Sequence, residues 1–172
     1  MNAPETVQKQ ENELIAAYRI WISALLAVYS KTGVIPSAYV QRTGNRLSRQ
    51  SSDARQLAAE LMWDIVGELP ETRAWLEVQL GKSVRGIDRV LRQYHVDPIP
   101  LRVRAHCAEV ARRIKPVLTL DLVRVAIEAG WTASETRGVK AVRGTHHLLR
   151  VAQVSIGEES VPPSRPVPRA EW

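Results

Sequence analysis

Three sets of basic side chains recur in this sequence at the spacing of one helix face. In the first, Arg85, Arg89 and Arg92 stand at positions i, i+4 and i+7, so a helix would place their guanidinium groups in one row. Like charges at this spacing repel by about 0.2–0.5 kcal/mol per pair, and a bound anion would relieve the repulsion. Because guanidinium groups match phosphate in a bidentate geometry, the chemistry that this pattern suggests is phosphate binding.

Two further basic sets keep the same spacing: Arg42, Arg46 and Arg49; and Arg143, His146, His147 and Arg150 if that segment is helical. No aspartate or glutamate occurs from residue 137 to residue 150. The alternative for any one set is a solvated face with acidic partners, and Asp88 lies where it could neutralise Arg85 or Arg92. The three sets together favour contact with the phosphates of DNA or RNA, which position a protein without reading sequence.

The motif Gly81-Lys82-Ser83 matches the end of a nucleotide-binding P-loop. Such a loop needs a further glycine where this sequence has Leu76, and it needs an apolar strand before it, which is missing here. We therefore expect no nucleotide cofactor at this motif.

Metal binding and covalent catalysis have little support among the histidines and the cysteine. His146 and His147 are adjacent, so a helix would point them apart, and no Cys, Asp or Glu lies at ligand spacing. The single cysteine, Cys107, excludes an internal disulfide and a cluster of thiolates for zinc. His106 precedes it, but sequence neighbours on a helix do not face each other as a nucleophile and its base must. We expect no metal, no catalytic residue and no enzymatic activity.

The stretch 125–144, VAIEAGWTASETRGVKAVRG, indicates two short helices joined by a turn at Gly130. Ala126 is small where two helices would approach closely, Val125 and Ala129 supply an inner face, and Val139 would pack inward from the second helix. Four positions remain for the outer face of the second helix: Ser134, Glu135, Arg137 and Lys140.

Over residues 121–144 the sequence resembles the helix-turn-helix superfamily of DNA-binding proteins. The resemblance implies that the second helix enters the major groove with its N-terminal residues at the base edges. The alternative is an ordinary helical hairpin in which Gly130 caps the first helix.

Helical spacing of apolar residues extends over most of the chain and predicts an all-α fold of about six to eight helices in one compact domain, 1–156. The longest helix is expected at residues 7–31, where Leu14, Tyr18, Trp21 and Leu25 fall on one face. Further helices are expected at 37–49, 51–67, 70–80, 83–94, 101–114, 119–129 and 132–143. Residues 150–156 fit a short strand as well as a helix, and Pro98 and Pro100 mark a possible sub-boundary at 96–100.

Residues 157–172 are rich in proline, serine and charge, which indicates an extended C-terminal tail. We expect this tail to become ordered only against another protein subunit. Trp172 would then dock on that partner, because an aromatic side chain on an exposed tail has no core to join.

The overall composition agrees with a globular protein that meets polyanions. The 172 residues are 45% hydrophobic, carry a formal charge of +6 and have a pI near 9.9. The N-terminal residues lack the pattern of a secretory signal, and the most apolar run, 20–29, is shorter than the roughly 20 residues that span a bilayer. We expect a cytoplasmic protein without membrane contact.

These observations predict a non-enzymatic, basic, helical nucleic-acid-binding protein, such as a helix-turn-helix DNA-binding regulator or accessory factor. The alternative is a helical subunit of a larger protein or ribonucleoprotein assembly, with basic faces on nucleic acid and the tail on a partner chain. The predicted nucleic-acid contacts are Arg42, Arg46, Arg49, Arg85, Arg89, Arg92, Ser134, Arg137, Lys140, Arg143 and Arg150.

Overall fold

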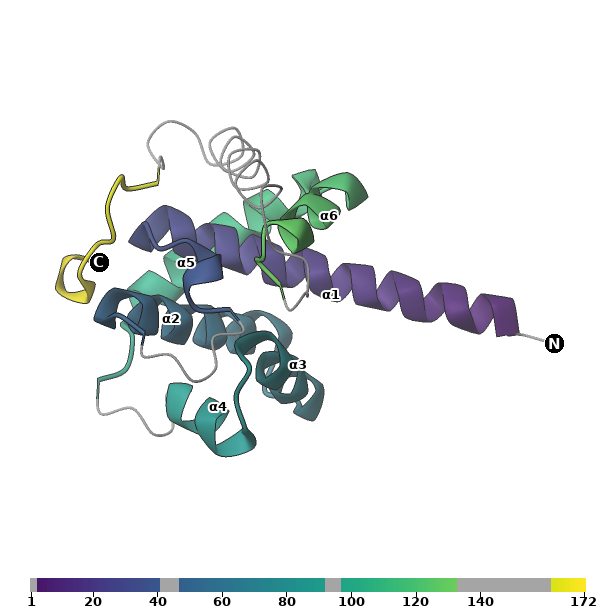
Figure 1. Cartoon of the computed structure of the whole chain (residues 1–172), viewed down its shortest axis with the longest axis horizontal. Coiled ribbons are helices and arrows are strands. Elements are labelled where there is room, and N and C mark those ends of the chain that lie inside the picture. The colour runs from purple at the N-terminus through teal and green to yellow at the C-terminus, as the bar shows by residue number, and fades with distance from the viewer. Residues whose placement is uncertain (1–2, 41–46, 92–96, 133–161) are drawn as a thin grey trace.

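The computed structural model describes residues 3–40, 47–91, 97–132 and 162–172. These residues form six α-helices and no strand, which confirms the all-α prediction. The helices are α1 (Ala3–Thr32), α2 (Arg49–Val66), α3 (Pro70–Leu80), α4 (Val84–Val90), α5 (Leu101–Ile114) and α6 (Leu120–Glu128) (Figure 1). Short 3-10 turns occupy η1 (Pro36–Ala38), η2 (Lys115–Val117) and η4 (Arg169–Glu171). The predicted helix at 132–143 and the undecided segment 150–156 lie outside the described residues.

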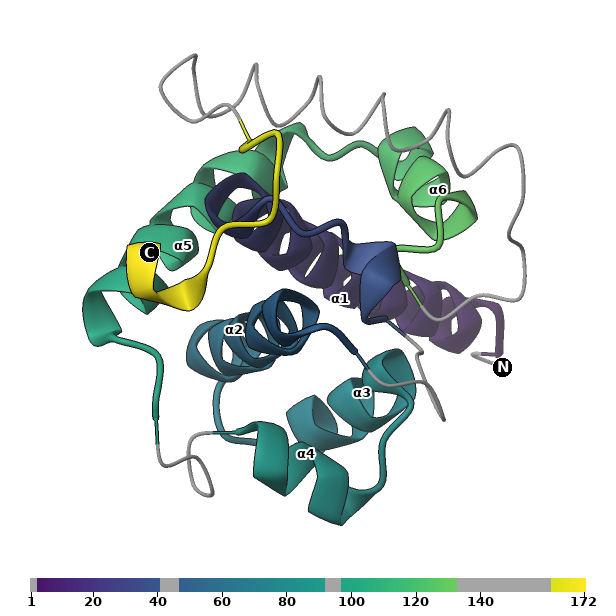
Figure 2. The ribbon, with the colours of Figure 1, turned by 60° about the vertical axis from the view of Figure 1, so that its left-hand side comes forward.

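Helix α1 is the centre of the molecule. It packs against α2, α5 and α6, whereas α3 and α4 pack against α2 (Figures 1 and 2). Both views place α3 and α4 on one side of α2, with α6 on the far side of the bundle. The buried cluster includes residues on both sides of Pro98 and Pro100, so this connection joins two parts of one core.

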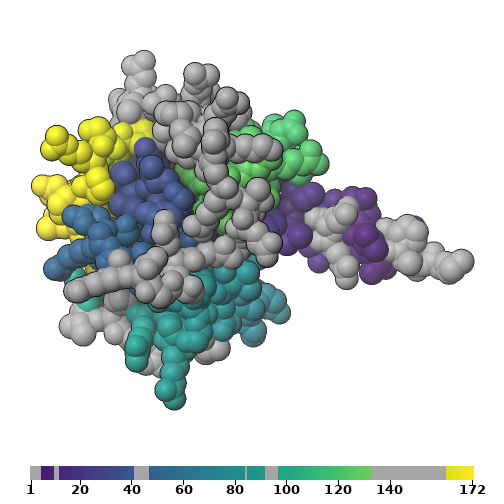
Figure 3. Space-filling model, viewed as in Figure 1, coloured from purple at the N-terminus to yellow at the C-terminus, as the bar shows by residue number. Residues whose placement is uncertain are grey.

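The two halves of α1 have opposite environments. Every residue from Trp21 to Tyr29 is buried, because helices cover this part of α1 on several sides. The N-terminal half projects from the body, and Val7 and Leu14 on it are exposed (Figures 1 and 3). By length and composition the segment Glu5–Thr32 would also suffice to cross a membrane, but half of its apolar window is buried inside the protein, as in a core helix.

Most helix ends lie where the sequence places them, because local capping determines them. Pro70 opens α3, and Gly81 follows it in the left-handed conformation, with φ 58°. The Thr119 hydroxyl caps α6 by accepting a hydrogen bond from the Leu122 N–H at 3.3 Å. Helix α5 has the predicted bounds of 101–114.

Two predicted helices are wrong in extent. The predicted helix at 37–49 is only the 3-10 turn η1 in its described part, and α2 begins afresh at Arg49. Ser48 before it is extended, with ψ 160°, and its hydroxyl accepts a hydrogen bond from the Ser51 N–H at 3.1 Å. Helix α4 ends at Val90, because the buried Leu91 is extended, with ψ 154°.

The described part of the C-terminal segment, residues 162–172, lies against the chain's own helices. The Val167 N–H donates to the Thr32 carbonyl at 2.8 Å, at the end of α1. Gly33 there has φ +70°, and a Cβ atom on it would lie 2.6 Å from the Arg165 carbonyl oxygen. Only glycine permits so close an approach of the two backbones.

Trp172 corrects the prediction that this segment has no core to join. Its side chain is 6% exposed and belongs to the hydrophobic core, and its indole N–H donates to the Val167 carbonyl at 3.3 Å. The Arg102 guanidinium of α5 donates to the Trp172 carbonyl at 3.2 Å. Trp172, which was predicted to dock on a partner protein, therefore packs within this chain.

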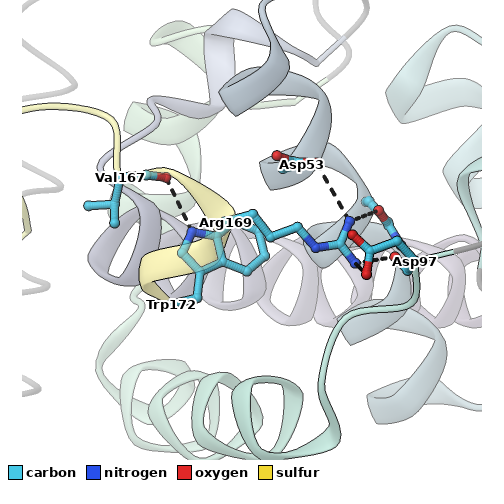
Figure 4. A network of polar contacts seen from close by, with 6 residues as sticks. Asp53, Asp97, Val167, Arg169 and Trp172 are labelled. Carbon is cyan, nitrogen blue, oxygen red and sulfur yellow. Dashed lines mark hydrogen bonds and ion pairs between the residues drawn. The ribbon is translucent and has the colours of Figure 1, made fainter.

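Arg169 connects this segment to α2 (Figure 4). Its guanidinium donates to the Gln56 side-chain oxygen at 3.0 Å and lies 3.6 Å from the Asp53 carboxylate. It also donates to the Asp97 carbonyl and lies 3.8 Å from the Asp97 carboxylate. Both Arg169 and Asp53 are only 15% exposed, so these contacts are partly shielded from water.

Replacing Arg169 by Ala should lower the free energy of unfolding by about 1–3 kcal/mol, because Gln56 and Asp53 would lose a charged partner. Urea denaturation measures this difference. Arg165→Ala is the matched control, since Arg165 is an exposed arginine of the same segment and its change should stay within about 0.5 kcal/mol. Equal losses in the two variants would contradict the anchoring role of Arg169.

Candidate nucleic-acid interface

Two members of the first predicted set, Arg85 and Arg89, lie on α4 and are exposed. Their i, i+4 spacing places both guanidinium groups on one side of this helix. The prediction that Arg92 extends this row is wrong, because α4 ends at Val90. The Leu91 N–H closes the helix on the Ile87 carbonyl at 2.9 Å, and Arg92 itself lies outside the described residues.

The alternative interpretation was that Asp88 could neutralise Arg85 or Arg92. In the structure, Asp88 is engaged with another arginine. Its carboxylate lies 3.0 Å from the Arg73 guanidinium of α3. Arg73 also lies over the Trp63 ring, 5.9 Å from its centroid. The acidic residue of α4 thus joins α4 to α3, and the exposed arginines keep their charge.

The second predicted set does not share one helix face. Ser48 is extended immediately before Arg49, so a helix cannot continue from Arg42 and Arg46 into Arg49. Arg49 is exposed at the first position of α2. Arg42 and Arg46 lie outside the described residues.

The structure adds two cations that the helical spacing did not reveal, Arg55 on α2 and Lys82 in the turn between α3 and α4. Burial lowers the pKa of the Lys82 ammonium group, and the positive charges of Arg55 and Arg89 lower it further. Burial also lowers the pKa of Arg55, and its Nε atom has no hydrogen-bond acceptor within the described part of the chain. The Gly81-Lys82-Ser83 motif was the available signal, but it marks a tight turn here rather than a P-loop.

Arginines elsewhere in the described residues are mostly paired with carboxylates. Arg104 lies 3.2 Å from Asp64, and Arg112 lies 2.6 Å from Glu109. This pairing with Arg112 holds the pKa of the Glu109 carboxyl below its usual range. In contrast, Arg49 at the start of α2 has no carboxylate within 4 Å among the described residues, and four cations farther along the α2–α4 region also have none: Arg55, Lys82, Arg85 and Arg89. We call these four side chains the α2–α4 basic surface.

The first half of the predicted helix-turn-helix unit is described, and its turn has the expected residues. Ala126 is fully buried, and Gly130 has φ 77°. The Trp131 N–H donates to the Ala126 carbonyl at 3.0 Å and the Gly130 N–H to the Ile127 carbonyl at 3.1 Å, which is a Schellman motif. This geometry suits both a helix-turn-helix unit and an ordinary hairpin.

Trp131 enters the core directly after this turn. It is fully buried, and its ring centroid lies 6.2 Å from that of Tyr29 on α1. The start of the predicted recognition segment is thereby fixed to the central helix. The remaining predicted contacts lie outside the described residues: Ser134, Arg137, Lys140, Arg143 and Arg150.

No family model, curated protein or solved structure matches this chain. Evidence for its function therefore comes from its own residues. In the described parts of the chain, no three His, Cys, Asp or Glu side chains gather as a metal site would require.

Cys107 lies in the core on α5, where its thiol is fully buried. Burial raises the pKa of this thiol to about 12, although the charge of Lys31 acts in the opposite direction. Since the thiolate is the nucleophile, the folded protein holds Cys107 in its unreactive form at neutral pH.

Iodoacetamide should therefore alkylate Cys107 much more slowly in the folded protein than in the denatured chain at about pH 8, near the ordinary thiol pKa. Mass spectrometry over time measures both rates. Addition of guanidinium chloride should restore the rate of a free thiol. Equally fast labelling without denaturant would contradict the burial of this residue.

Proposed function

We propose that this chain is a non-enzymatic nucleic-acid-binding protein that contacts phosphates through the α2–α4 basic surface. The observation that carries the proposal is the grouping of four cations without a carboxylate partner in the described residues, where six of the ten other described arginines pair with carboxylates. Arg85 and Arg89 are exposed and suited to phosphate contacts.

The composition of neighbouring segments supports a polyanionic ligand. Residues 41–46 precede α2 and residues 92–96 follow α4, and they contain Arg42, Arg46, Arg92 and His95 but no acidic residue. The whole chain carries a formal charge of +6. A nucleic acid offers regularly spaced phosphates to such a surface, and release of its counterions favours binding.

A sequence-reading role for residues 121–144 forms part of the same proposal. Its support is the small, buried Ala126 and the left-handed Gly130, which together allow a second helix to turn back on α6. Under the hairpin alternative, the chain binds phosphates without a preferred sequence.

A second candidate function is that of a helical subunit in a larger assembly. The projecting half of α1 favours it, because Val7 and Leu14 are exposed there on a helix that leaves the body (Figure 3). Such a subunit would bind nucleic acid weakly alone and tightly with its partner.

Replacing both Arg85 and Arg89 by Ala should weaken nucleic-acid binding without unfolding the protein. Each lost phosphate contact should reduce the slope of log K against log salt by about 0.9 for duplex DNA and about 0.7 for single strands. Fluorescence anisotropy over a range of salt concentrations measures this slope.

The control for this double variant is Arg112→Ala with Arg113→Ala on α5, which removes the same charge from arginines that pair with Glu109. It should leave the slope nearly unchanged. If both double variants lower the slope equally, net charge rather than the α2–α4 basic surface governs binding.

Arg137 and Lys140 test the sequence-reading part. Arg137→Ala should reduce the preference for the favoured duplex by about 1–3 kcal/mol if Arg137 makes a bidentate contact with a base. Lys140→Ala should instead weaken all duplexes about equally. Competition between a selected duplex and its scrambled counterpart, at one salt concentration, separates the two effects. A parent protein with no preference would refute this part and leave the phosphate contacts standing.

A further inference from the structure

Lys82 is held in place by the turn that joins α3 to α4. Gly81 adopts the left-handed conformation, and the Lys82 N–H donates to the Glu77 carbonyl at 3.1 Å. The next residue, Ser83, caps α4, since its hydroxyl accepts a hydrogen bond from the Gly86 N–H at 3.3 Å. Hydrogen bonds on both sides therefore fix the backbone that carries this ammonium group.

Gly86 lets the Lys82 side chain lie along α4. A Cβ atom at Gly86 would approach the Lys82 Cβ atom to 3.1 Å and its Cδ atom to 3.4 Å. Gly86 and Arg89 are three residues apart on α4 and share one face of that helix, and the Lys82 stem contacts this face at Gly86. The absent side chain at Gly86 leaves room for the Lys82 stem.

Arg55 lies on α2, which packs against α4. Its charge and that of Arg89 both act on Lys82. The Arg55 Nε atom is buried and lacks an acceptor within the described residues. A buried donor without a partner is costly, and a bound ion is one way in which proteins satisfy it.

The charges of Arg55 and Arg89 act unfavourably on Lys82, none of the three has a carboxylate within 4 Å among the described residues, and a bound anion would relieve this repulsion. Two carboxylates close to these cations in sequence are engaged elsewhere, Asp53 with Arg169 and Asp88 with Arg73, and no ion pair within 4 Å joins Glu77 to Lys82. Arg55, Lys82 and Arg89 are therefore the part of the α2–α4 basic surface that is suited to bind an anion.

We propose that Arg55, Lys82 and Arg89 form a binding site for one phosphate group, held between α2 and the α3–α4 turn. Lys82 supplies a compact positive charge, and the two guanidinium groups supply directed donors to separate phosphate oxygens. That this phosphate belongs to a nucleic-acid backbone rests on the proposed function. That the site binds a phosphate group is independent of the proposed function.

Titration of Lys82 with inorganic phosphate tests the site. NMR of protein with 13C-labelled lysine follows the Lys82 Cε signal against pH, and Lys82→Gln identifies that signal. Phosphate should raise the pKa of Lys82, because a bound anion favours the charged ammonium form. At matched ionic strength, chloride should raise it much less. No change with phosphate, or the same change with chloride, would overturn the proposal.

The affinity for phosphate should fall about tenfold in Lys82→Gln and in Arg55→Gln, the loss expected for one charged hydrogen bond. The Arg55 Nε–H signal reports binding in the lysine variant, and the Lys82 signal reports it in the arginine variant. Arg113→Gln on α5, with the same loss of charge, should bind phosphate like the parent. Equal affinity in all three variants would refute the site even if they fold normally.

An oligonucleotide distinguishes this site from the proposed function. If it displaces phosphate from Lys82, the ligand is a nucleic-acid phosphate. If phosphate binds and the oligonucleotide does not, the site holds and takes a small phosphorylated molecule, and the proposed function fails. If the oligonucleotide binds but inorganic phosphate does not act on Lys82, the phosphate site fails and the proposed function remains.

Discussion

Burial of the α1 segment from Trp21 to Tyr29 is the constraint on which the rest of the structure depends. A helix buried on several sides requires apolar faces from α2, α5 and α6 together, and each of these helices then has its polar face turned outward. Helices α3 and α4 pack against α2 instead, which leaves the outer side of α4 free for charge. The basic surface is thus a consequence of how the core is filled around one helix.

Local signals were sufficient to predict most of the fold. Pro70, Gly81 and Thr119 mark helix ends because they act on the backbone next to them, whatever the rest of the chain does. The extent of α4 could not be predicted in this way. Its last turn is lost because Leu91 is buried in an extended conformation, and that burial depends on tertiary packing.

The candidate site was only half visible in the sequence. Arg85 and Arg89 share a helix, so their spacing reveals them, whereas Arg55 lies on α2, and only the packing of α2 against α4 brings it to this region. Lys82 stands in a motif whose turn was recognisable, but the direction of its side chain depends on the absent side chain of Gly86. Trp172 was misjudged for the same reason, since composition indicates a tail but does not show the core that receives it.

The contact between Thr32 and Val167 has a consequence for how the protein folds as it is made. The ends of α1, α2 and α5 stay uncovered until the ribosome has synthesised the chain through Trp172. Such contacts between distant parts of a sequence slow folding, because a long loop must close before they form. During that interval the core lacks the Trp172 side chain, and the apolar surface that receives it is exposed.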